Sequence, residues 1–155
     1  MQLSTRGRYA VMAMAELACR EAGDYRCGHV TVAELAAAQH LSSCYLEQLF
    51  GRMRRAGLVR SARGPGGGYR LARPAGQITV ADVIAAAEEN VSTTRCQPGG
   101  PGCDAAPPGE RCLTHGLWEA LSTHIATFLR NVTLADVIGG TVSAVAAQPA
   151  AVQAA

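Results

Sequence analysis

Three cysteines and one histidine lie within residues 96–115, at Cys96, Cys103, Cys112 and His115. The rest of this segment consists mainly of Gly, Pro and small polar residues, which cannot bury an apolar core of their own. Thiolates and an imidazole that converge on a metal centre would supply the ordering free energy that packing does not. The residue types therefore predict a metal centre with these four side chains as its ligands.

The spacing of the four candidate ligands leaves several kinds of site open. Three cysteines and a histidine are a familiar zinc set, but zinc sites usually contain short Cys-x₂₋₄-Cys spacings, whereas the first gaps here are six and eight residues. A 2Fe–2S cluster accepts wider gaps because its ligands bind two iron ions rather than one tetrahedral ion. The chemistry favours the iron–sulfur cluster over zinc, and zinc over a disulfide-bonded or metal-free loop.

The cysteine content also bears on the cellular compartment. No stretch approaches the roughly 18 apolar residues of a membrane span, and no charged segment precedes an apolar one at the N-terminus. We therefore expect a cytoplasmic protein without a membrane partner, in which the six cysteines serve metal binding or redox chemistry before structural disulfides. Cys19 is expected to be a small core residue of the first helix, and Cys27 has no usable partner spacing.

Positive charge is concentrated in the first half of the chain. Residues 1–75 contain 11 Arg and 5 acidic residues, a net charge of +6, while residues 76–155 contain 3 Arg and 7 acidic residues, a net charge of −4. A basic half indicates a polyanionic partner such as DNA. The alternative is a solvated basic face, and charge alone does not decide between the two.

Three stretches of sequence share one pattern that starts a helix. Thr31, Thr79 and Thr133 are each preceded by an apolar residue and followed three positions later by an acidic residue, which is the pattern of a capping box with a hydrophobic staple. The intervals of 48 and 54 residues between them are unequal, so the pattern predicts three helix starts rather than a repeat architecture. Ser42 and Thr114 are expected to be the N-caps of two further helices.

The basic half, residues 1–75, is expected to form a winged helix-turn-helix domain. Apolar periodicity predicts helices over 5–22, 32–40 and 43–56, and the last two form a helix-turn-helix with a polar, basic outer face. Two strands joined by the glycine-rich tip 63–68 would form the wing. The candidate DNA contacts are Ser43, Cys44, Tyr45, Glu47, Gln48, Arg52, Arg54, Arg55, Arg63 and Gly66.

Different roles are expected among these candidate contacts. Glu47 and Gln48 are predicted to contact base edges, whereas Arg52, Arg54 and Arg55 are predicted to hold phosphates. The glycines of the wing tip lack the Lys and Ser/Thr of a P-loop, and a strand rather than a helix follows them. Nucleotide binding is therefore a minor alternative for the tip.

The acidic half is expected to contain a connecting helix in 76–95, the metal-binding segment 96–115, a long helix with a C-terminal cap in 116–138, and a disordered or frayed tail in 139–155. The long helix presents one apolar arc, made of Leu117, Trp118, Leu121, Ile125, Phe128 and Leu129. Little chain remains to cover this arc, so we expect it to pack on the same helix of a second copy. Packing on the first helix is the alternative, and His124 is expected at the interface rather than as a ligand.

The sequence resembles the IscR-type iron–sulfur cluster regulators, which are winged-helix transcription factors, over about residues 1–138. The similar stretches are 3–11, 43–50 and 63–69, and above all the residues around Cys96, Cys103, Cys112 and His115, with 117–118 and 131–134 after them. The resemblance implies that these four residues hold a 2Fe–2S cluster. This sequence differs from the family in two places: its gap between Cys103 and Cys112 is longer than in the best-known members, and Cys44 stands where the family usually has Ser.

The family resemblance further implies a homodimer that binds double-stranded promoter DNA. When loaded with its cluster it would repress its own iron–sulfur cluster assembly genes, and in either form it would act, as repressor or activator, on other promoters. The cluster assembly machinery is the implied cluster donor. A nitric-oxide- or iron-responsive regulator of the same superfamily and a zinc-structured DNA-binding protein are the alternatives. We expect no enzymatic activity, because no nucleophile–base pair lacks a better explanation.

Overall fold

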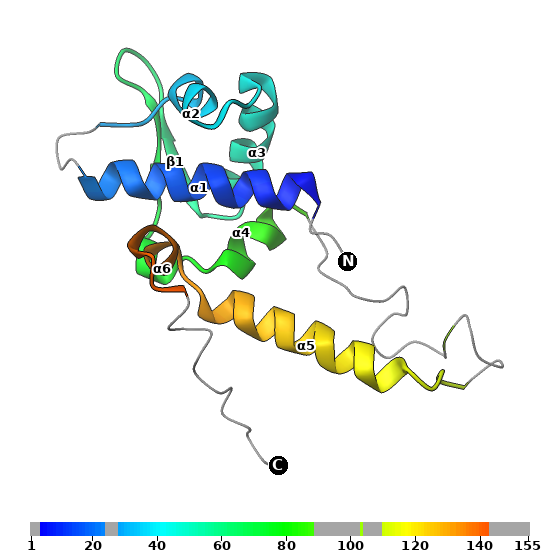
Figure 1. Ribbon diagram of the computed structural model, residues 1–155. Coiled ribbons are helices and arrows are strands. Elements are labelled where there is room, and N and C mark those ends of the chain that lie inside the picture. Colours follow the sequence, from blue (N-terminus) through cyan, green and yellow to red (C-terminus); the bar gives the residue numbers. More distant parts are fainter. Residues whose placement is uncertain (1–3, 24–27, 89–102, 104–109, 143–155) are drawn as a thin grey trace.

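The structure is a computed structural model that describes residues 4–23, 28–88, 103 and 110–142 (Figure 1). The protein is mainly helical with one small hairpin, as predicted. Its elements are α1 (Thr5–Gly23), α2 (Val32–Gln39), α3 (Ser43–Arg55), β1 (Val59–Ala62), β2 (Gly68–Leu71), the 3-10 turn η1 (Ala75–Gln77), α4 (Val80–Ala86), α5 (His115–Asn131) and α6 (Leu134–Gly139). Cys27, Cys96 and the expected tail beyond residue 142 lie outside the described residues.

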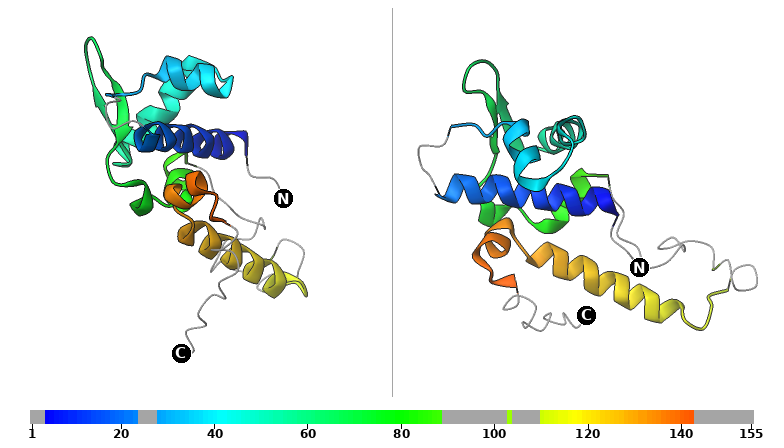
Figure 2. Two further views of the ribbon diagram at one scale, coloured as in Figure 1. Left: turned by 60° about the vertical axis from the view of Figure 1, so that its left-hand side comes forward. Right: turned by 45° about the horizontal axis from the view of Figure 1, so that its top comes forward.

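Helix α1 runs through the middle of the molecule. The helices α2 and α3 and the hairpin lie on one side of it, and α4 and α6 lie on the other (Figures 1 and 2). A row of small and apolar α1 residues, including Ala10, Met14 and Leu17, is buried between these two layers. Cys19 faces away from this row and is exposed, so the prediction that it is a core residue is wrong.

The core of the first half of the chain is formed where α3 meets α1 and the hairpin. Leu46, Leu49, Phe50 and Met53 of α3 are all buried, which confirms the predicted apolar stripe at helical spacing. The ring of Phe50 lies 4.9 Å from that of Tyr69 on β2. This packing fixes the hairpin against the helix that follows the tight turn, as a winged helix-turn-helix requires.

The three predicted capping boxes are all present. Thr31, Thr79 and Thr133 each accept a hydrogen bond from the backbone N–H three positions later, and the acidic side chain there accepts one from the backbone of the threonine. Ser42 and Thr114 occupy the N-cap positions of α3 and α5, as predicted, but neither makes a side-chain capping bond. Neither has an acidic residue at the third helical position to complete a box, so one half of the pattern was missing.

Two of these helix starts are joined to each other. Val80 donates a backbone hydrogen bond to Val132 at 2.8 Å, and Leu134 donates one to Ile78 at 2.9 Å, so residues 79 and 133 form an antiparallel bridge. Val132 is buried in a small cluster with two apolar residues of α4. The C-terminal end of α5 is therefore anchored to the start of α4.

The wing is a two-stranded antiparallel hairpin in which residue 59 pairs with 71 and residue 62 with 68. Val30 and Tyr69 exchange backbone hydrogen bonds of 2.8 and 2.7 Å, which adds a short third strand position beside β2. Gly68 has φ +149, and a Cβ there would lie 2.5 Å from the carbonyl oxygen of Val30. Only glycine allows the backbone of Val30 to approach this closely.

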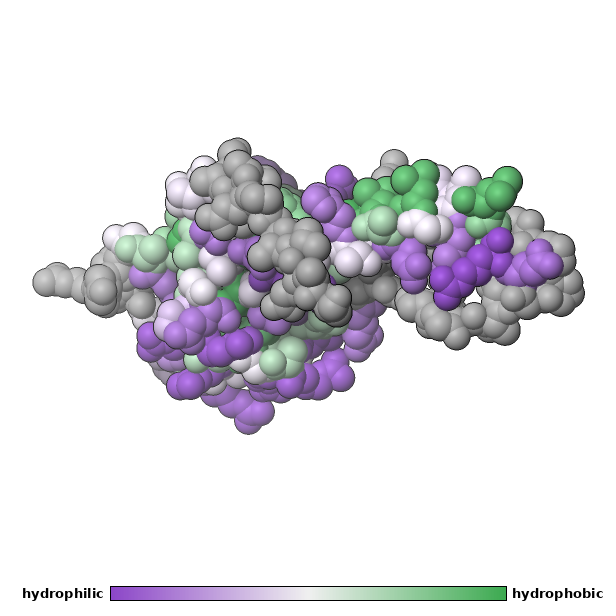
Figure 3. Space-filling model, turned by 90° about the horizontal axis from the view of Figure 1, so that it is seen from below, coloured by the Kyte–Doolittle hydropathy of each residue, from purple (hydrophilic) through white to green (hydrophobic). Residues whose placement is uncertain are grey.

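Helix α5 extends away from the rest of the molecule (Figures 1 and 2). None of its residues is buried, and the side chains of Leu117 and Trp118 are 61% and 40% exposed. Figure 3 shows hydrophobic side chains gathered along this part of the surface. Only the far end of the arc, at Phe128 and Leu129, packs against the small cluster of α4.

Candidate metal centre and DNA-binding surface

The structure describes three of the four predicted metal ligands and brings two of them into direct contact. The sulfur of Cys103 lies 3.1 Å from Nδ1 of His115, although twelve positions separate the two residues. Cys103 is buried, and its backbone N–H donates to the carbonyl oxygen of Glu110 at 3.0 Å. This bond holds Cys103 beside the start of α5 and directs its thiol toward the imidazole.

Cys112, the third described ligand, lies just before α5. The hydroxyl of Thr114 is 3.6 Å from its sulfur, and this hydrogen bond is the main reason that the pKa of the Cys112 thiol is lowered. The Cys103 thiol contributes to the same lowering. Thr114 thus favours a thiolate at Cys112. The sequence analysis had expected its hydroxyl to cap α5 instead. The backbone N–H of His115 donates to the Cys112 carbonyl at 3.0 Å.

The second nitrogen of the His115 ring faces a carboxylate. Nε2 of His115 lies 3.7 Å from Oε2 of Glu119, one turn further along α5, and Nη1 of Arg111 lies 3.7 Å from the same oxygen. A carboxylate on the far nitrogen of a ligating histidine orients the ring and makes the other nitrogen a better ligand. The sequence analysis missed Glu119, although its i, i+4 spacing from His115 could have revealed it.

These residues suit an iron–sulfur cluster by their chemistry. Two thiols and an imidazole are close to one another at the N-terminal end of α5, where the helix dipole favours an anionic centre. Thiolate and imidazole are ligands for both iron–sulfur clusters and zinc. No three such side chains within the described residues surround one ion-sized point, and Cys96 remains a predicted ligand outside them.

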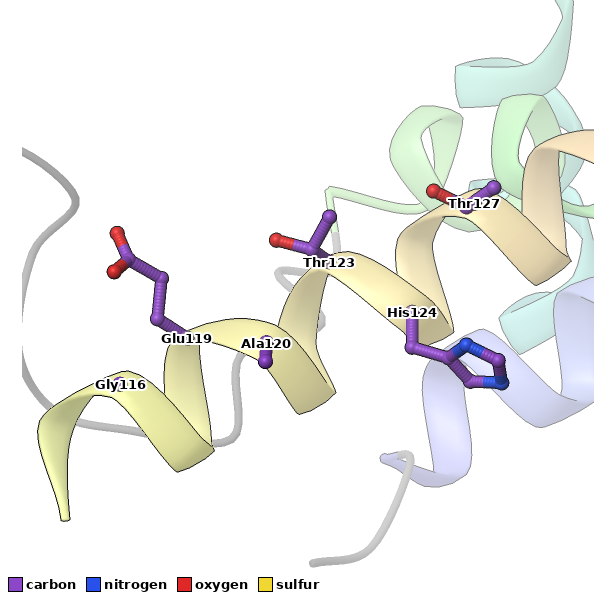
Figure 4. Close-up of a pocket in the computed structure, with 6 residues that line it drawn as sticks. All are labelled: Gly116, Glu119, Ala120, Thr123, His124 and Thr127. Atoms are coloured by element: carbon purple, nitrogen blue, oxygen red, sulfur yellow. The ribbon is translucent and has the colours of Figure 1, made fainter. Parts of the chain in front are cut away.

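A shallow hollow lies along another side of α5 (Figure 4). It is lined by Gly116, Glu119, Ala120, Thr123, His124 and Thr127. The His124 side chain points to a different side of the helix from those of Glu119 and Thr123. His124 is nine positions after His115, which is about 13 Å along the helix axis, so the two imidazoles are too far apart to bind one metal ion.

The outer face of α3 presents most of the predicted DNA contacts to solvent. Ser43, Cys44, Glu47 and Gln48 are exposed, as a helix that enters the major groove requires. Tyr45 is half-buried instead, and its ring meets the ring of Tyr9 edge-on at 6.1 Å. The remaining exposed candidates are Arg54, Arg55, Arg63 and Gly66.

Arg52 differs from the other basic residues of α3. Its Nη1 donates hydrogen bonds to the carbonyl oxygen of Ala87 at 3.2 Å and to Oε2 of Glu88 at 2.8 Å. The side chain is 25% exposed. Arg54 and Arg55, by contrast, are exposed. The guanidinium of Arg52 therefore binds the two residues that follow α4 rather than facing solvent freely.

The hairpin carries two arginines that the sequence analysis did not include among the DNA contacts. Arg60 and Arg70 are directly opposite each other in the register of the two strands, and both are exposed. Like charges in opposite positions destabilise a hairpin. Within the part of the chain that the structure describes, no carboxylate forms an ion pair with either of them. Pairing the two predicted strands by register would have revealed them.

Comparison with known proteins places the chain in a family. The model of the Rrf2 family, described as iron-dependent transcriptional regulators, matches residues 3–140. The chain belongs to the Rrf2 family. It is 48% identical over 138 residues to the HTH-type transcriptional regulator IscR of Cronobacter sakazakii, covering 89% of this chain and 80% of that protein. The IscR of Citrobacter koseri is 47% identical over the same length.

Solved structures of Rrf2 regulators agree with the fold. CymR, the global cysteine regulator of B. subtilis, superposes with a TM-score of 0.72 at 31% identity, covering 91% of this chain and 98% of CymR. IscR of T. potens superposes with a TM-score of 0.68 at 34% identity, covering 96% and 94% of the two chains. This Rrf2 protein is therefore a DNA-binding transcriptional regulator of the winged-helix type and not an enzyme, as expected.

One further finding concerns membranes. None of the helices in the described part of the chain combines the length and the apolar content needed to cross a bilayer.

Proposed function

We propose that this Rrf2 protein regulates iron–sulfur cluster assembly genes by sensing cluster status through a 2Fe–2S cluster bound to Cys96, Cys103, Cys112 and His115. The observation that supports this most is the 3.1 Å contact between the Cys103 sulfur and His115 Nδ1. It joins a thiol and an imidazole at the start of α5, in a chain that resembles proteins named IscR over most of its length. The protein acts in the cytoplasm and receives its cluster from the assembly machinery.

The ligand residues determine how tightly such a cluster would be held. Three thiolates and a neutral imidazole give an oxidised 2Fe–2S site a formal charge of about −1, compared with about −2 for four thiolates. The Thr114 hydroxyl favours the thiolate of Cys112, and Glu119 orients His115. A histidine ligand can leave by taking up a proton, so occupancy follows the cellular supply of clusters.

The recognition helix α3 and the wing supply the DNA contacts of the proposal. Gln48 contacts base edges, and Glu47 accepts from a cytosine amino group and is repelled elsewhere. Arg54 and Arg55 contact phosphates, and Arg63 at the wing tip enters a narrow minor groove, where negative potential is concentrated. Gly66 in the same tip allows a close approach to the DNA backbone. Ser43, Cys44 and Tyr45 lie at the helix end that enters the groove.

Homodimerisation completes the proposal. The apolar arc of α5, with Leu117 and Trp118 exposed and Leu121 and Ile125 half-buried, packs on a second copy. Phe128 and Leu129 lie at the C-terminal end of the arc. Two recognition helices then meet half-sites about 34 Å apart. Loading of the cluster at the start of α5 alters their spacing, so the loaded and empty proteins prefer different operators.

The deciding experiment combines three measurements on anaerobically purified full-length protein. We expect the protein to absorb visible light and to contain iron and sulfide in equal amounts. A colourless protein that contains zinc would support the zinc-structured alternative. Operator affinities of loaded and empty protein are expected to differ. Equal affinities at every promoter would reject the sensing role. Sedimentation should give a dimer that Leu117→Glu converts toward monomer, and a wild-type monomer would reject the α5 interface.

A further inference from the structure

We propose that Arg52 is a positioning residue that couples the recognition helix α3 to the metal-binding half of the chain through Ala87 and Glu88. This inference rests on the proposed cluster-sensing function and gives it a specific residue contact. It also replaces the phosphate-binding role that the sequence predicted for Arg52.

The contact between Arg52 and the end of α4 has two acceptors. One guanidinium nitrogen donates to the Ala87 carbonyl at 3.2 Å and to the Glu88 carboxylate at 2.8 Å. The carbonyl belongs to the C-terminal end of α4, where the helix dipole concentrates negative charge and a cation is stabilising. A charge-assisted hydrogen bond is stronger than a neutral one. Arg52 therefore holds both the C-terminal end of α4 and the side chain of the next residue, Glu88.

The backbone at the contact has little freedom to adjust. Helix α4 ends at Ala86, Ala87 is fully buried, and Glu88 turns to a φ of +57. A non-glycine residue in this left-handed conformation persists only where its surroundings hold it. The bond to Arg52 is one such constraint. A shift of this end of α4 therefore acts on Arg52, and through it on α3.

Two connections lead from the candidate metal ligands to α4, one along the chain to its C-terminal end and one through space to the side that starts at Val80. Along the chain, Glu88 is eight positions before Cys96. Through space, α5 begins with His115 and packs on α4, with Phe128 and Leu129 against a cluster that contains Val80 and Ile84. Both connections reach α4, and Arg52 continues from α4 into α3.

On the DNA side, the position of Arg52 matches the residues that would read bases. Arg52 is one helical turn after Gln48 and on the same face of α3, because residues four apart lie above one another. A tilt of α3 that Arg52 imposes would therefore move Gln48 relative to the base edges. A phosphate contact fits less well, because DNA would have to displace the Glu88 carboxylate and then lie beside its negative charge.

The test uses full-length loaded and empty protein, with affinities measured for an operator that distinguishes the two forms. Glu88→Asn is the main variant, because Asn tolerates positive φ and the substitution removes the carboxylate that binds Arg52. A coupling between two sites typically corresponds to about 5- to 150-fold in affinity. We expect Glu88→Asn and Arg52→Gln each to reduce the loaded-to-empty ratio to within about twofold of one, and the double variant to go no further.

Arg55→Gln is the matched control on the same helix. We expect it to lower the slope of log affinity against log salt by about one unit and to keep the loaded-to-empty ratio. Arg52→Gln should show the reverse pattern. If Arg52→Gln does not fold, Arg52→Lys replaces it in the test. Arg52→Lys keeps the charge but loses the planar fork of the guanidinium, so it should also reduce the loaded-to-empty ratio.

Three outcomes would overturn the inference. If Glu88→Asn keeps the wild-type ratio while the wild type discriminates, sensing stands and Arg52 does not transmit it. If Arg52→Gln lowers the salt slope as Arg55→Gln does, Arg52 is a phosphate contact. If the wild-type forms do not differ at any operator, the proposed sensing fails first and there is nothing for Arg52 to couple.

Discussion

The thiol of Cys103 and the imidazole of His115 are neighbours, with Sγ and Nδ1 separated by 3.1 Å. Cys103 reaches this position through a backbone hydrogen bond to Glu110, and His115 occupies it as the first residue of α5. The nitrogen on the far side of the ring faces Glu119. A histidine in this position presents Nδ1 to the proposed metal centre, which leads to two predictions about how long a cluster is retained.

Replacing His115 by cysteine should lengthen cluster retention. A thiolate adds a negative charge to the ligand set and binds iron more strongly than a neutral imidazole that can leave after protonation. We expect reconstituted His115→Cys protein to lose its visible absorption more slowly than the wild type, with the largest difference at acidic pH. His124→Cys, further along α5, is the control and should behave like the wild type. Faster loss from His115→Cys would contradict the proposed role of the imidazole.

Removing the charge of Glu119 should have the opposite effect. Residues that orient a metal-binding histidine typically contribute about 10- to 100-fold to metal affinity or activity. Glu119→Gln should therefore release iron to a chelator about tenfold faster than the wild type. Thr123→Ala, one turn further along α5, controls for general effects on the helix. Unchanged release from Glu119→Gln, with an intact helix by circular dichroism, would show that Glu119 does not support His115.

The opposed arginines of the wing should affect stability and DNA binding in opposite directions. Arg70→Gln removes a like-charge pair with Arg60, so the free protein should gain about 0.2–1 kcal/mol, seen as a higher Tm. The same change should weaken operator binding and lower its salt slope by about one unit. Arg73→Gln is the control, because Arg73 lies near the carboxylate of Asp82 and not opposite another arginine, so its removal should not raise Tm. A lower Tm with unchanged DNA binding would mean that the pair serves the hairpin and not the DNA.

Acid should weaken the capping boxes in a defined direction. Hydrogen bonds from the Thr31 hydroxyl and backbone, at 2.6 and 2.7 Å, lower the pKa of Glu34, and Thr133 does the same to the pKa of Asp136. The folded pKa values lie below the unfolded ones, which are about 4.3 for Glu and 3.9 for Asp. The stabilisation is thus complete above these values and is lost as the pH falls through the folded pKa.

The measurement for this prediction is Tm as a function of pH. A protein with Glu34→Gln and Asp136→Asn should be less stable than the wild type near neutral pH and should lose less stability below about pH 4. Glu47→Gln, which is outside the capping boxes, should keep the wild-type profile. Parallel profiles for the wild type and the double variant would show that the two carboxylates do not contribute through these hydrogen bonds.

Features set by neighbouring residues could be predicted from the sequence. The three capping boxes depend on a threonine and an acidic residue three positions apart, and all three are present. The apolar stripe of α3 and the glycine-rich wing were predictable for the same reason. The contact between Cys103 and His115 was anticipated only as membership of one ligand set, because their spacing alone does not specify which pairs touch.

Features set by tertiary packing were not predictable. Cys19 is exposed because α1 buries a different face, and an isolated small residue does not indicate its side of a helix. One local feature was missed as well, because the hydroxyl of Thr114, at the N-cap position of α5, contacts Cys112 two positions earlier instead of the helix backbone. Arg52 resembles its basic neighbours in sequence, but it meets Glu88 at a separation of 36 positions. Glu88 in turn could not be recognised as a partner before the position of α4 was known.

Among the described residues, α5 is anchored to the other helices at its C-terminal end, and this has a mechanical consequence. Two backbone hydrogen bonds beside Val132 hold that end, whereas His115 is at the other end of a helix of 17 residues. Such a helix is about 25 Å long, so a rotation of about 5° at the attached end displaces the far end by about 2 Å. The helix therefore acts as a lever arm, and small rearrangements around its pivot correspond to large ones at its tip.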